Sequence, residues 1–124
     1  MLVDIRYAPR SRFYPQFRRE ALDRRYNVAG LSPMPASCQH VRYVWYQSLG
    51  NRNYAKGGPI RLDNPELGIP QVVAELRAGR DVILLCACCD ESRCHRLLVA
   101  RLVQDALAVR YTRQREQPQS GETL

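Results

Sequence analysis

Lysine is nearly absent from this sequence of 124 residues, in which Lys56 is the single lysine among 19 basic residues. The positive charge is therefore carried by arginine, whose planar group of donors suits phosphate and carboxylate partners. Long apolar runs are missing too: no stretch approaches the ~20 residues that span a bilayer. The opening segment reaches Asp4 too early for a secretory signal. These absences predict a cytoplasmic protein with no membrane partner.

A dispersed set of cysteines is also missing. Four of the five cysteines lie between Cys86 and Cys94, whereas a secreted disulfide framework spreads its cysteines so that they close long loops. The clustering favours a reducing compartment.

The rest of the composition is that of an ordinary globular chain. Hydrophobic residues make up 45% and charged residues 25% of the sequence, which is enough for one core. We therefore expect a single domain over residues 1–112 and a polar tail over residues 113–124.

The net charge of +7 is unevenly distributed. Residues 1–62 hold 11 Lys+Arg against 3 Asp+Glu, and residues 63–124 hold 8 against 9. A basic first half is typical of a protein that binds a polyanion. An arginine-rich, solvated surface that reflects codon usage explains it equally well.

Apolar patterning predicts strands and helices in alternation. The expected strands are Met1–Ile5, Val41–Tyr46, Val82–Cys86 and Ala108–Thr112, and the expected helices are Phe17–Arg25, Pro65–Ala78 and Cys94–Leu107. This order indicates an α/β fold, a single compact domain with a mostly parallel sheet of about four strands flanked by helices. The continuous apolar run Val82–Cys86 is typical of a central strand. Pro70 predicts that the regular part of its helix begins only near Ile69.

In parallel sheets, ligands bind beyond the carboxyl ends of the strands. Asp4 and Arg6 end the first strand, Asn51 follows the second, and the segment up to Arg96 follows the third. We expect all of these to open onto one edge.

Cys94, His95 and Arg96 stand where a helix should begin. Free backbone N–H groups there favour an anion, which Arg96 would also bind. Such a position also favours a reactive thiolate at Cys94, and His95 can act as acid or base near neutral pH. The alternative is structural: a buried cysteine, a capping histidine and an arginine in an ion pair.

Asp4 and Arg6 are two apart and so lie on the same side of an extended chain. Asp4 can serve as a base or orient a ligand, or it can form a structural ion pair with an arginine. Arg10 and Arg12 lead into Phe13 and Tyr14, a mixture that suits phosphate contact and stacking. A solvated loop is the other interpretation.

Two familiar sites fit poorly. A phosphatase or rhodanese loop has the pattern Cys-x-x-x-x-x-Arg, but Ala87 and Asp90 stand where Arg93 and Arg96 would need a cysteine. The cysteine cluster has enough ligands for zinc, yet structural zinc usually takes two separated pairs. We therefore assign no metal and no cofactor.

Several motifs follow one another in a recognisable order. They are the Asp-x-Arg strand end Val3–Arg6, the basic loop Pro9–Phe17, the Leu-Gly segment Leu49–Asn51, and Leu84–Ala87 followed by Cys94–Arg96. Together, over residues 2–107, they resemble the family called domain of unknown function 488 (DUF488). The resemblance implies an α/β fold and this motif set but no particular activity. Members commonly carry an earlier strand and helix, so an edge of the sheet is expected to be absent or supplied by a partner subunit, and oligomerisation stays open.

Three functional hypotheses remain. The first is an enzyme that acts on a phosphate-bearing substrate, a nucleotide or nucleic acid. Its candidate catalytic residues are Asp4, His95 and Cys94, and its candidate anion-binding residues are Arg6, Arg10, Arg12, Asn51 and Arg96. The second is a nucleic-acid-binding module without catalysis, and the third is a thiol-based metal or redox site. Whether the protein is an enzyme is left open.

Overall fold

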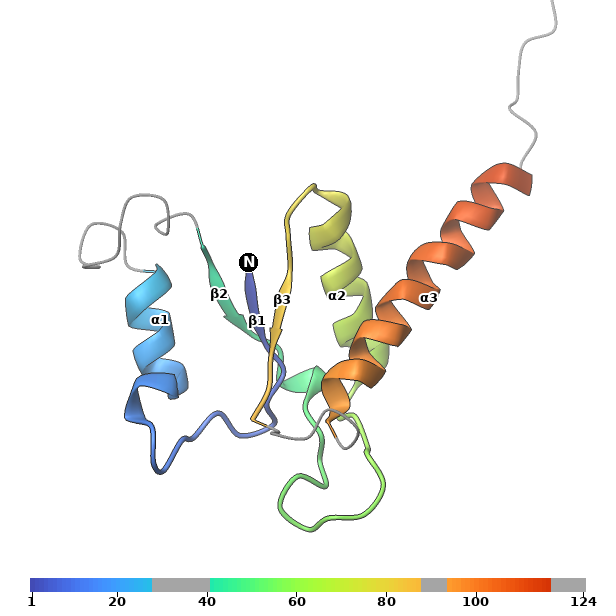
Figure 1. Ribbon diagram of the computed structural model, residues 1–124. Helices are drawn as coiled ribbons and strands as arrows, with labels where there is room; N and C mark the ends of the chain where they lie inside the picture. Colours follow the sequence, from blue (N-terminus) through green and yellow to red (C-terminus); the bar gives the residue numbers. More distant parts are fainter. Residues whose placement is uncertain (28–40, 88–93, 117–124) are drawn as a thin grey trace, which may run out of the picture.

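The computed structural model describes residues 1–27, 41–87 and 94–116. Within these ranges the chain forms a parallel sheet of three strands with three α-helices (Figure 1). The elements are β1 (Leu2–Asp4), the 3-10 turn η1 (Pro15–Phe17), α1 (Arg19–Asn27), β2 (Tyr43–Trp45), the 3-10 turn η3 (Gln47–Leu49), α2 (Pro65–Arg77), β3 (Ile83–Leu85) and α3 (His95–Glu116). The predicted α/β class is confirmed, with three strands in place of about four.

The sheet has the order β2-β1-β3, and both pairings of β1 are parallel. The prediction that Val82–Cys86 forms the central strand is wrong, because β1 occupies that place and β3 lies at an edge. Ile83 accordingly keeps 61% of its surface exposed. Apolar sequence alone did not distinguish the two strands, since pairing depends on contacts between distant parts of the chain.

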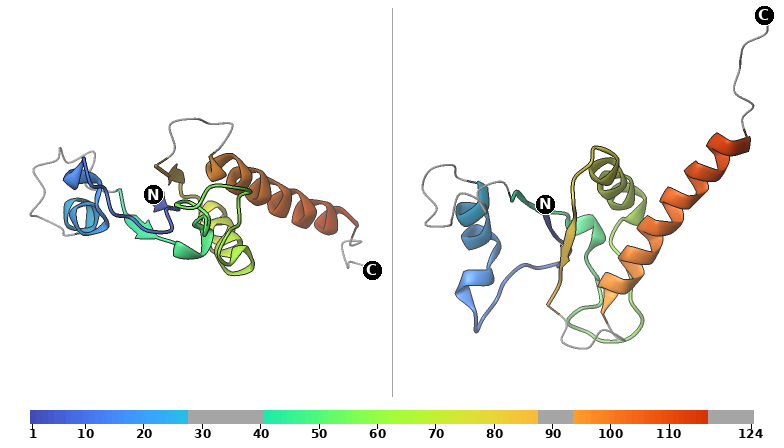
Figure 2. Two further views of the ribbon diagram at one scale, coloured as in Figure 1. Left: turned by 90° about the horizontal axis from the view of Figure 1, so that it is seen from below. Right: turned by 45° about the horizontal axis from the view of Figure 1, so that its top comes forward.

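Helices cover the sheet on two sides: α1 packs beside β2, whereas α2 and α3 lie together on the other side (Figures 1 and 2). Side chains of β1 alternate between these layers. Val3 and Ile5 enter the core with residues of α2 and α3, and Asp4 points to the opposite face. The buried core comprises Val3, Ile5, Leu49, Ile69, Val72, Val73, Val99 and Val103.

Helix α2 begins at Pro65, as the predicted range had it, and it is helical from there and not only from Ile69. Asn64 caps it, because its side chain accepts a hydrogen bond from the Leu67 N–H, and Pro65 occupies the first turn. Pro70 lies inside the helix and does not delay its start. Pro70 and Glu66 are both exposed, so the Glu66 carbonyl that loses its helical partner can be hydrated instead.

Helix α3 also corrects the sequence analysis. Ala108–Thr112 was expected to form a strand, but α3 runs without a break from His95 to Glu116. No glycine or proline interrupts the chain after Leu107 until Pro118, and most of the residues between them favour helix. The rest of the predicted tail, residues 117–124, lies outside the described residues, as do Cys88 and Cys89.

At Gly50, the segment that follows β2 packs closely against the segment that follows β1. A Cβ atom at this position would lie 2.5 Å from the Tyr7 Cα, so only glycine lets the two backbones approach this closely. The segments that leave β1 and β2 therefore meet at the carboxyl edge of the sheet. In the part of the chain that the structure describes, no helix has the length and apolar character needed to cross a membrane.

Candidate functional site

Asp4 lies at the centre of a buried polar cluster on the α1 side of the sheet. Its Oδ1 and Oδ2 accept hydrogen bonds from Nε and Nη2 of Arg6 at 2.8 and 2.6 Å. The Arg6 backbone N–H also donates to Oδ1, and the Tyr43 hydroxyl donates to Oδ2. Leu2 pairs with Tyr43 in the sheet register, which brings that hydroxyl to the face where Asp4 lies.

The contacts within this cluster shift the pKa values of Arg6 and Tyr43. Burial opposes the charged form of Arg6, but the hydrogen bonds and negative charge of Asp4 outweigh it and raise the pKa of Arg6. Burial, with the hydrogen bond to Asp4 and its negative charge, raises the pKa of Tyr43 well above its usual value. Asp4 has no exposed surface, so a substrate cannot touch its carboxylate in this conformation. The geometry makes Asp4 the group that positions Arg6.

His95 is the first residue of α3 and is buried at the carboxyl edge of the sheet. Its Nε2 lies 2.6 Å from the Ile5 carbonyl oxygen. A carbonyl only accepts, so Nε2 carries the hydrogen and Nδ1 carries the lone pair. Burial lowers the pKa of His95, and the hydrogen bond to Ile5 opposes that shift only in part.

The lowered pKa of His95 makes the stability of the protein depend on pH. The neutral imidazole is favoured in the folded state, whereas the unfolded chain takes up a proton near the ordinary value of 6.5. The contribution of His95 is therefore complete above that pH and is lost as the pH falls toward the lower folded-state pKa. Urea unfolding between pH 7 and pH 5 should show a decline that is smaller in His95→Gln, and equal slopes in the two proteins would contradict this assignment.

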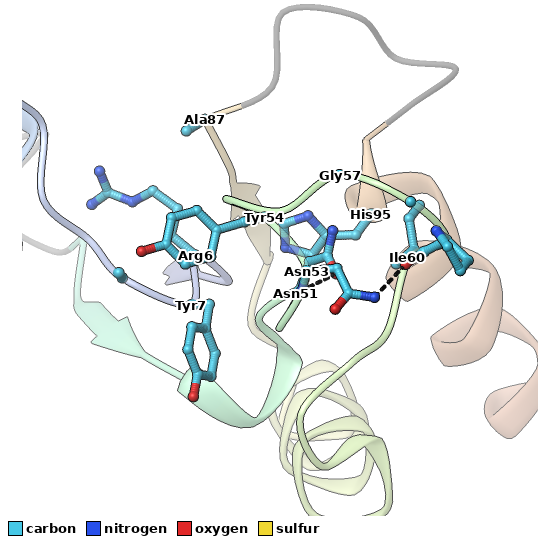
Figure 3. A pocket seen from close by; sticks show the side chains of 12 residues that line it. Arg6, Tyr7, Asn51, Asn53, Tyr54, Gly57, Ile60, Ala87 and His95 are labelled. Carbon is cyan, nitrogen blue, oxygen red and sulfur yellow. Dashed lines mark hydrogen bonds between the residues drawn. The ribbon is translucent and has the colours of Figure 1, made fainter.

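A pocket of about 590 Å³ opens beside His95. Residues from separate segments converge on it: Arg6 after β1, Asn51 after η3, Ala87 after β3 and His95 at the start of α3 (Figure 3). The complete lining is Arg6, Tyr7, Ala8, Asn51, Asn53, Tyr54, Gly57, Gly58, Pro59, Ile60, Ala87 and His95. The expected meeting of strand ends at one edge is thus present for Arg6, Asn51 and His95.

One wall of the pocket is the loop 51–62, and the Asn51 side chain stabilises its conformation by hydrogen bonds. The side-chain oxygen of Asn51 accepts hydrogen bonds from the backbone N–H groups of Asn53 and Arg61. Asn53 in turn donates from Nδ2 to the Pro59 carbonyl (Figure 3). An isolated bridge between Asn51 and Leu62 closes the base of the loop. These contacts use the Asn51 side-chain oxygen and the Asn53 NH2, and not the Asn51 NH2 or the Asn53 side-chain oxygen.

Two tyrosines add aromatic surface to the pocket. The ring centroids of Tyr7 and Tyr54 lie 6.0 Å apart with an interplanar angle of 42°, and Tyr54 is 59% exposed. Exposed aromatic faces of this kind stack on planar ligands. Sequence reasoning missed Tyr7, Asn53 and Tyr54, although two asparagines and a tyrosine beside Gly57 and Gly58 in a long loop were a visible signal.

The sequence matches a family model, DUF488-N3a, which is described as the active DUF488-N3 subclade, over residues 2–107. The chain belongs to the DUF488 family. No curated protein and no solved structure matches it. Every residue that lines the pocket falls within the matched range. The DUF488 match therefore covers the whole candidate site, but it names no reaction.

The remaining candidate residues of this DUF488 protein do not line the pocket. Arg10 and Arg12 line a second hollow of about 410 Å³ with Arg18 and Glu20. Arg96 places Nη1 3.7 Å from the Cys86 Sγ, and Cys94 is buried with 2% of its surface exposed. The expected cluster of arginines is thus divided among three places.

Because the other arginines lie outside the lining, the pocket carries little charge. Among the residues that line it, all of which the structure describes, Arg6 alone carries a formal charge, and Asp4 balances that charge. Arg6 uses Nε and Nη2 for Asp4, and in Figure 3 its guanidinium points away from His95 and the two asparagines. The polar and aromatic residues of the lining are thus one arginine, two asparagines, two tyrosines and a histidine.

Proposed function

We propose that this DUF488 protein is an enzyme that acts on a nucleotide, or a related phosphate-bearing small molecule, bound in the pocket beside His95. The observation that carries the proposal is the environment of His95: its Nε2 lies at hydrogen-bonding distance from the Ile5 carbonyl, and burial lowers its pKa, which favours the neutral ring. Nδ1 makes no hydrogen bond to any described residue, and no buried side-chain nitrogen in the described chain lacks a partner. Nδ1 is therefore not sealed in the interior, and because His95 lines the pocket, we take Nδ1 as the atom that accepts a proton there.

The other lining residues suit a nucleotide. A base can stack on Tyr54 or Tyr7, because the aromatic face contacts any planar ring. The amides of Asn51 and Asn53 supply a donor and an acceptor for the polar edge of a base or for ribose hydroxyls. Arg6 Nη1 is the proposed phosphate contact, and Asp4 fixes the orientation of that guanidinium. In this proposal Asp4 positions the Arg6 guanidinium, Arg6 binds the phosphate, and His95 accepts the proton.

The binding part of the proposal is tested with a matched pair of variants. Tyr54 and Tyr14 are each 59% exposed, but Tyr54 lines the pocket and Tyr14 does not. Loss of one stacking contact costs about 1–3 kcal/mol, so Tyr54→Ala should weaken nucleotide binding by roughly fivefold to a hundredfold or more, and Tyr14→Ala should leave it unchanged. Calorimetric titration with nucleoside mono- and diphosphates measures both. Equal affinities in the two variants would place the ligand elsewhere.

A second candidate function rests on the segment Pro9–Arg18, which precedes α1. Phe13 is 81% exposed at this loop, and the hollow beside it is lined by Arg10, Arg12 and Arg18. Internal hydrogen bonds fix the loop, since the Arg18 Nε donates to the Ser11 carbonyl and the Tyr14 N–H donates to the Ser11 hydroxyl. Fixed aromatics among arginines suit a single-stranded nucleic acid, with bases on the rings and phosphates on the guanidinium groups.

The two functions are separable with the same variants. A nucleic-acid-binding module predicts that an oligonucleotide binds less tightly as salt rises and that Phe13→Ala and Tyr14→Ala weaken this binding, while Tyr54→Ala does not. Fluorescence anisotropy with a labelled single strand gives the affinity at several salt concentrations. Binding that does not respond to salt, or that persists in Phe13→Ala, would remove this candidate.

A further inference from the structure

A pair of cysteines outside the pocket lining lies within reach of bond formation. Cys86 follows β3, and Cys94 directly precedes α3. Their Sγ atoms are 2.7 Å apart, and neither cysteine forms a disulfide in this structure. We propose that Cys86 and Cys94 are a redox pair that forms a reversible disulfide between the end of β3 and the start of α3. The proposal does not depend on the function assigned to the pocket.

Arg96 places hydrogen-bond donors beside both sulfur atoms of this pair. Arg96 places Nη1 3.7 Å from the Cys86 Sγ, and a neighbouring guanidinium stabilises a thiolate. The Arg96 backbone N–H, at the start of α3, lies 3.4 Å from the Cys94 Sγ and donates to it. One residue thus contacts both sulfur atoms, through its side chain on one side and its backbone on the other.

The two cysteines differ in exposure, which sets the order of events. Cys86 is partly exposed, whereas Cys94 keeps only 2% of its surface accessible. Cys86 is therefore the thiol that an external oxidant reaches first, and Cys94 is the thiol that resolves the intermediate.

The oxidant is a low-molecular-weight disulfide such as glutathione disulfide. Cys86 loses its proton, and its thiolate attacks one sulfur of that disulfide; a mixed disulfide forms and one small thiolate leaves. Cys94 then loses its proton and attacks the Cys86 Sγ, so that the internal S–S bond forms and the second small thiolate leaves. The two protons end on the two small thiols. The protein pair is oxidised by two electrons, and the small disulfide is reduced by two.

The bond would form in the wall of the candidate site. Ala87 follows Cys86, His95 follows Cys94, and both line the pocket. A disulfide would therefore link the backbone before Ala87 to the backbone before His95, at the start of α3.

Trypsin separates the two partners, which makes the test direct. Cleavage after Arg80, Arg93 and Arg96 releases one peptide, 81–93, with Cys86, Cys88 and Cys89, and a second, 94–96, with Cys94 alone. The purified full chain is equilibrated with glutathione disulfide or with reduced glutathione, alkylated, digested and analysed by mass spectrometry. We expect the two peptides to be linked under the oxidising condition, through Cys86 in the fragment spectra, and unlinked under the reducing one.

Two variants decide which cysteine is used. The double variant Cys88→Ser/Cys89→Ser should keep the link, because Cys86 is then the single cysteine of its peptide, and Cys86→Ser should lose it. If Cys86→Ser fails to fold, the double variant still decides. Absence of the link in the double variant, a link from Cys94 to Cys38, or unlinked peptides at every glutathione ratio would overturn the proposal.

Discussion

Replacement of Asp4 by asparagine is expected to lower the free energy of unfolding by about 3–5 kcal/mol, the usual cost of breaking a buried ion pair from one side. Asp4 is fully buried and Arg6 is only 8% exposed, so the variant leaves a guanidinium in the interior without its carboxylate. Asparagine keeps the shape of the side chain but supplies one acceptor oxygen where three side-chain donors converge. Urea unfolding followed by circular dichroism measures the loss.

Glu75 provides the matched control for this prediction. It forms an ion pair with Arg80 at 2.7 Å through one hydrogen bond, and the two side chains are 23% and 49% exposed. Glu75→Gln should therefore cost no more than about 1 kcal/mol. Similar losses in the two variants would show that burial does not decide the strength of the Asp4–Arg6 pair.

The second large effect is expected from His95→Gln in any reaction that the pocket performs. Removal of a general base typically costs about 10²- to 10⁴-fold in rate, and glutamine can still donate a hydrogen bond to the Ile5 carbonyl. We therefore expect kcat to fall by that factor, while KM changes little and the protein stays folded. Steady-state kinetics with the substrate identified by the binding experiments measures both constants.

The pH dependence of the rate separates a base from a merely structural histidine. Burial lowers the pKa of His95 below its ordinary value of 6.5, and a base works only when it is unprotonated. In the natural protein kcat/KM should be constant near pH 7 and fall as the pH drops through that lowered pKa. The His95→Gln variant should lose this limb of the profile. If the limb persists, another group is the base.

The sequence predicted which strand ends meet better than it predicted which side chains line the pocket there. The rule that parallel strands end at one edge brought Arg6, Asn51 and His95 to the same place, and the structure lines one pocket with all three. The rule follows from sheet topology, so it does not depend on the direction of any side chain. It could not reveal that Arg96 turns to Cys86 or that Arg12 faces a different hollow.

Contacts that depend on register were beyond the sequence. Spacing placed Asp4 and Arg6 on one side of their strand, and the structure pairs them. The third member of that cluster, Tyr43, comes from a strand whose alignment with β1 is set by the whole sheet. The central position of β1 was missed for the same reason, because a run of apolar residues indicates burial but does not identify neighbours.

The extent of α3 shows a different limit. The residues after Leu107 alternate enough to suggest a strand, and their intrinsic preference for helix is weak evidence taken alone. The helix is already anchored in the core by Val99 and Val103, and each further residue then adds its hydrogen bond at little cost. Cooperative extension from a packed segment is a tertiary effect, so a short window of sequence did not reveal it.

The central claim is that a nucleotide-like ligand binds in the pocket beside His95. The most direct test is a crystal structure determined after a crystal of the protein has been soaked with a nucleoside monophosphate. The account predicts that the base packs on Tyr54 or Tyr7 and that a polar atom of the ligand lies within hydrogen-bonding distance of His95 Nδ1. A ligand seated on Arg10 and Arg12, or an empty pocket at saturating concentration, would contradict it.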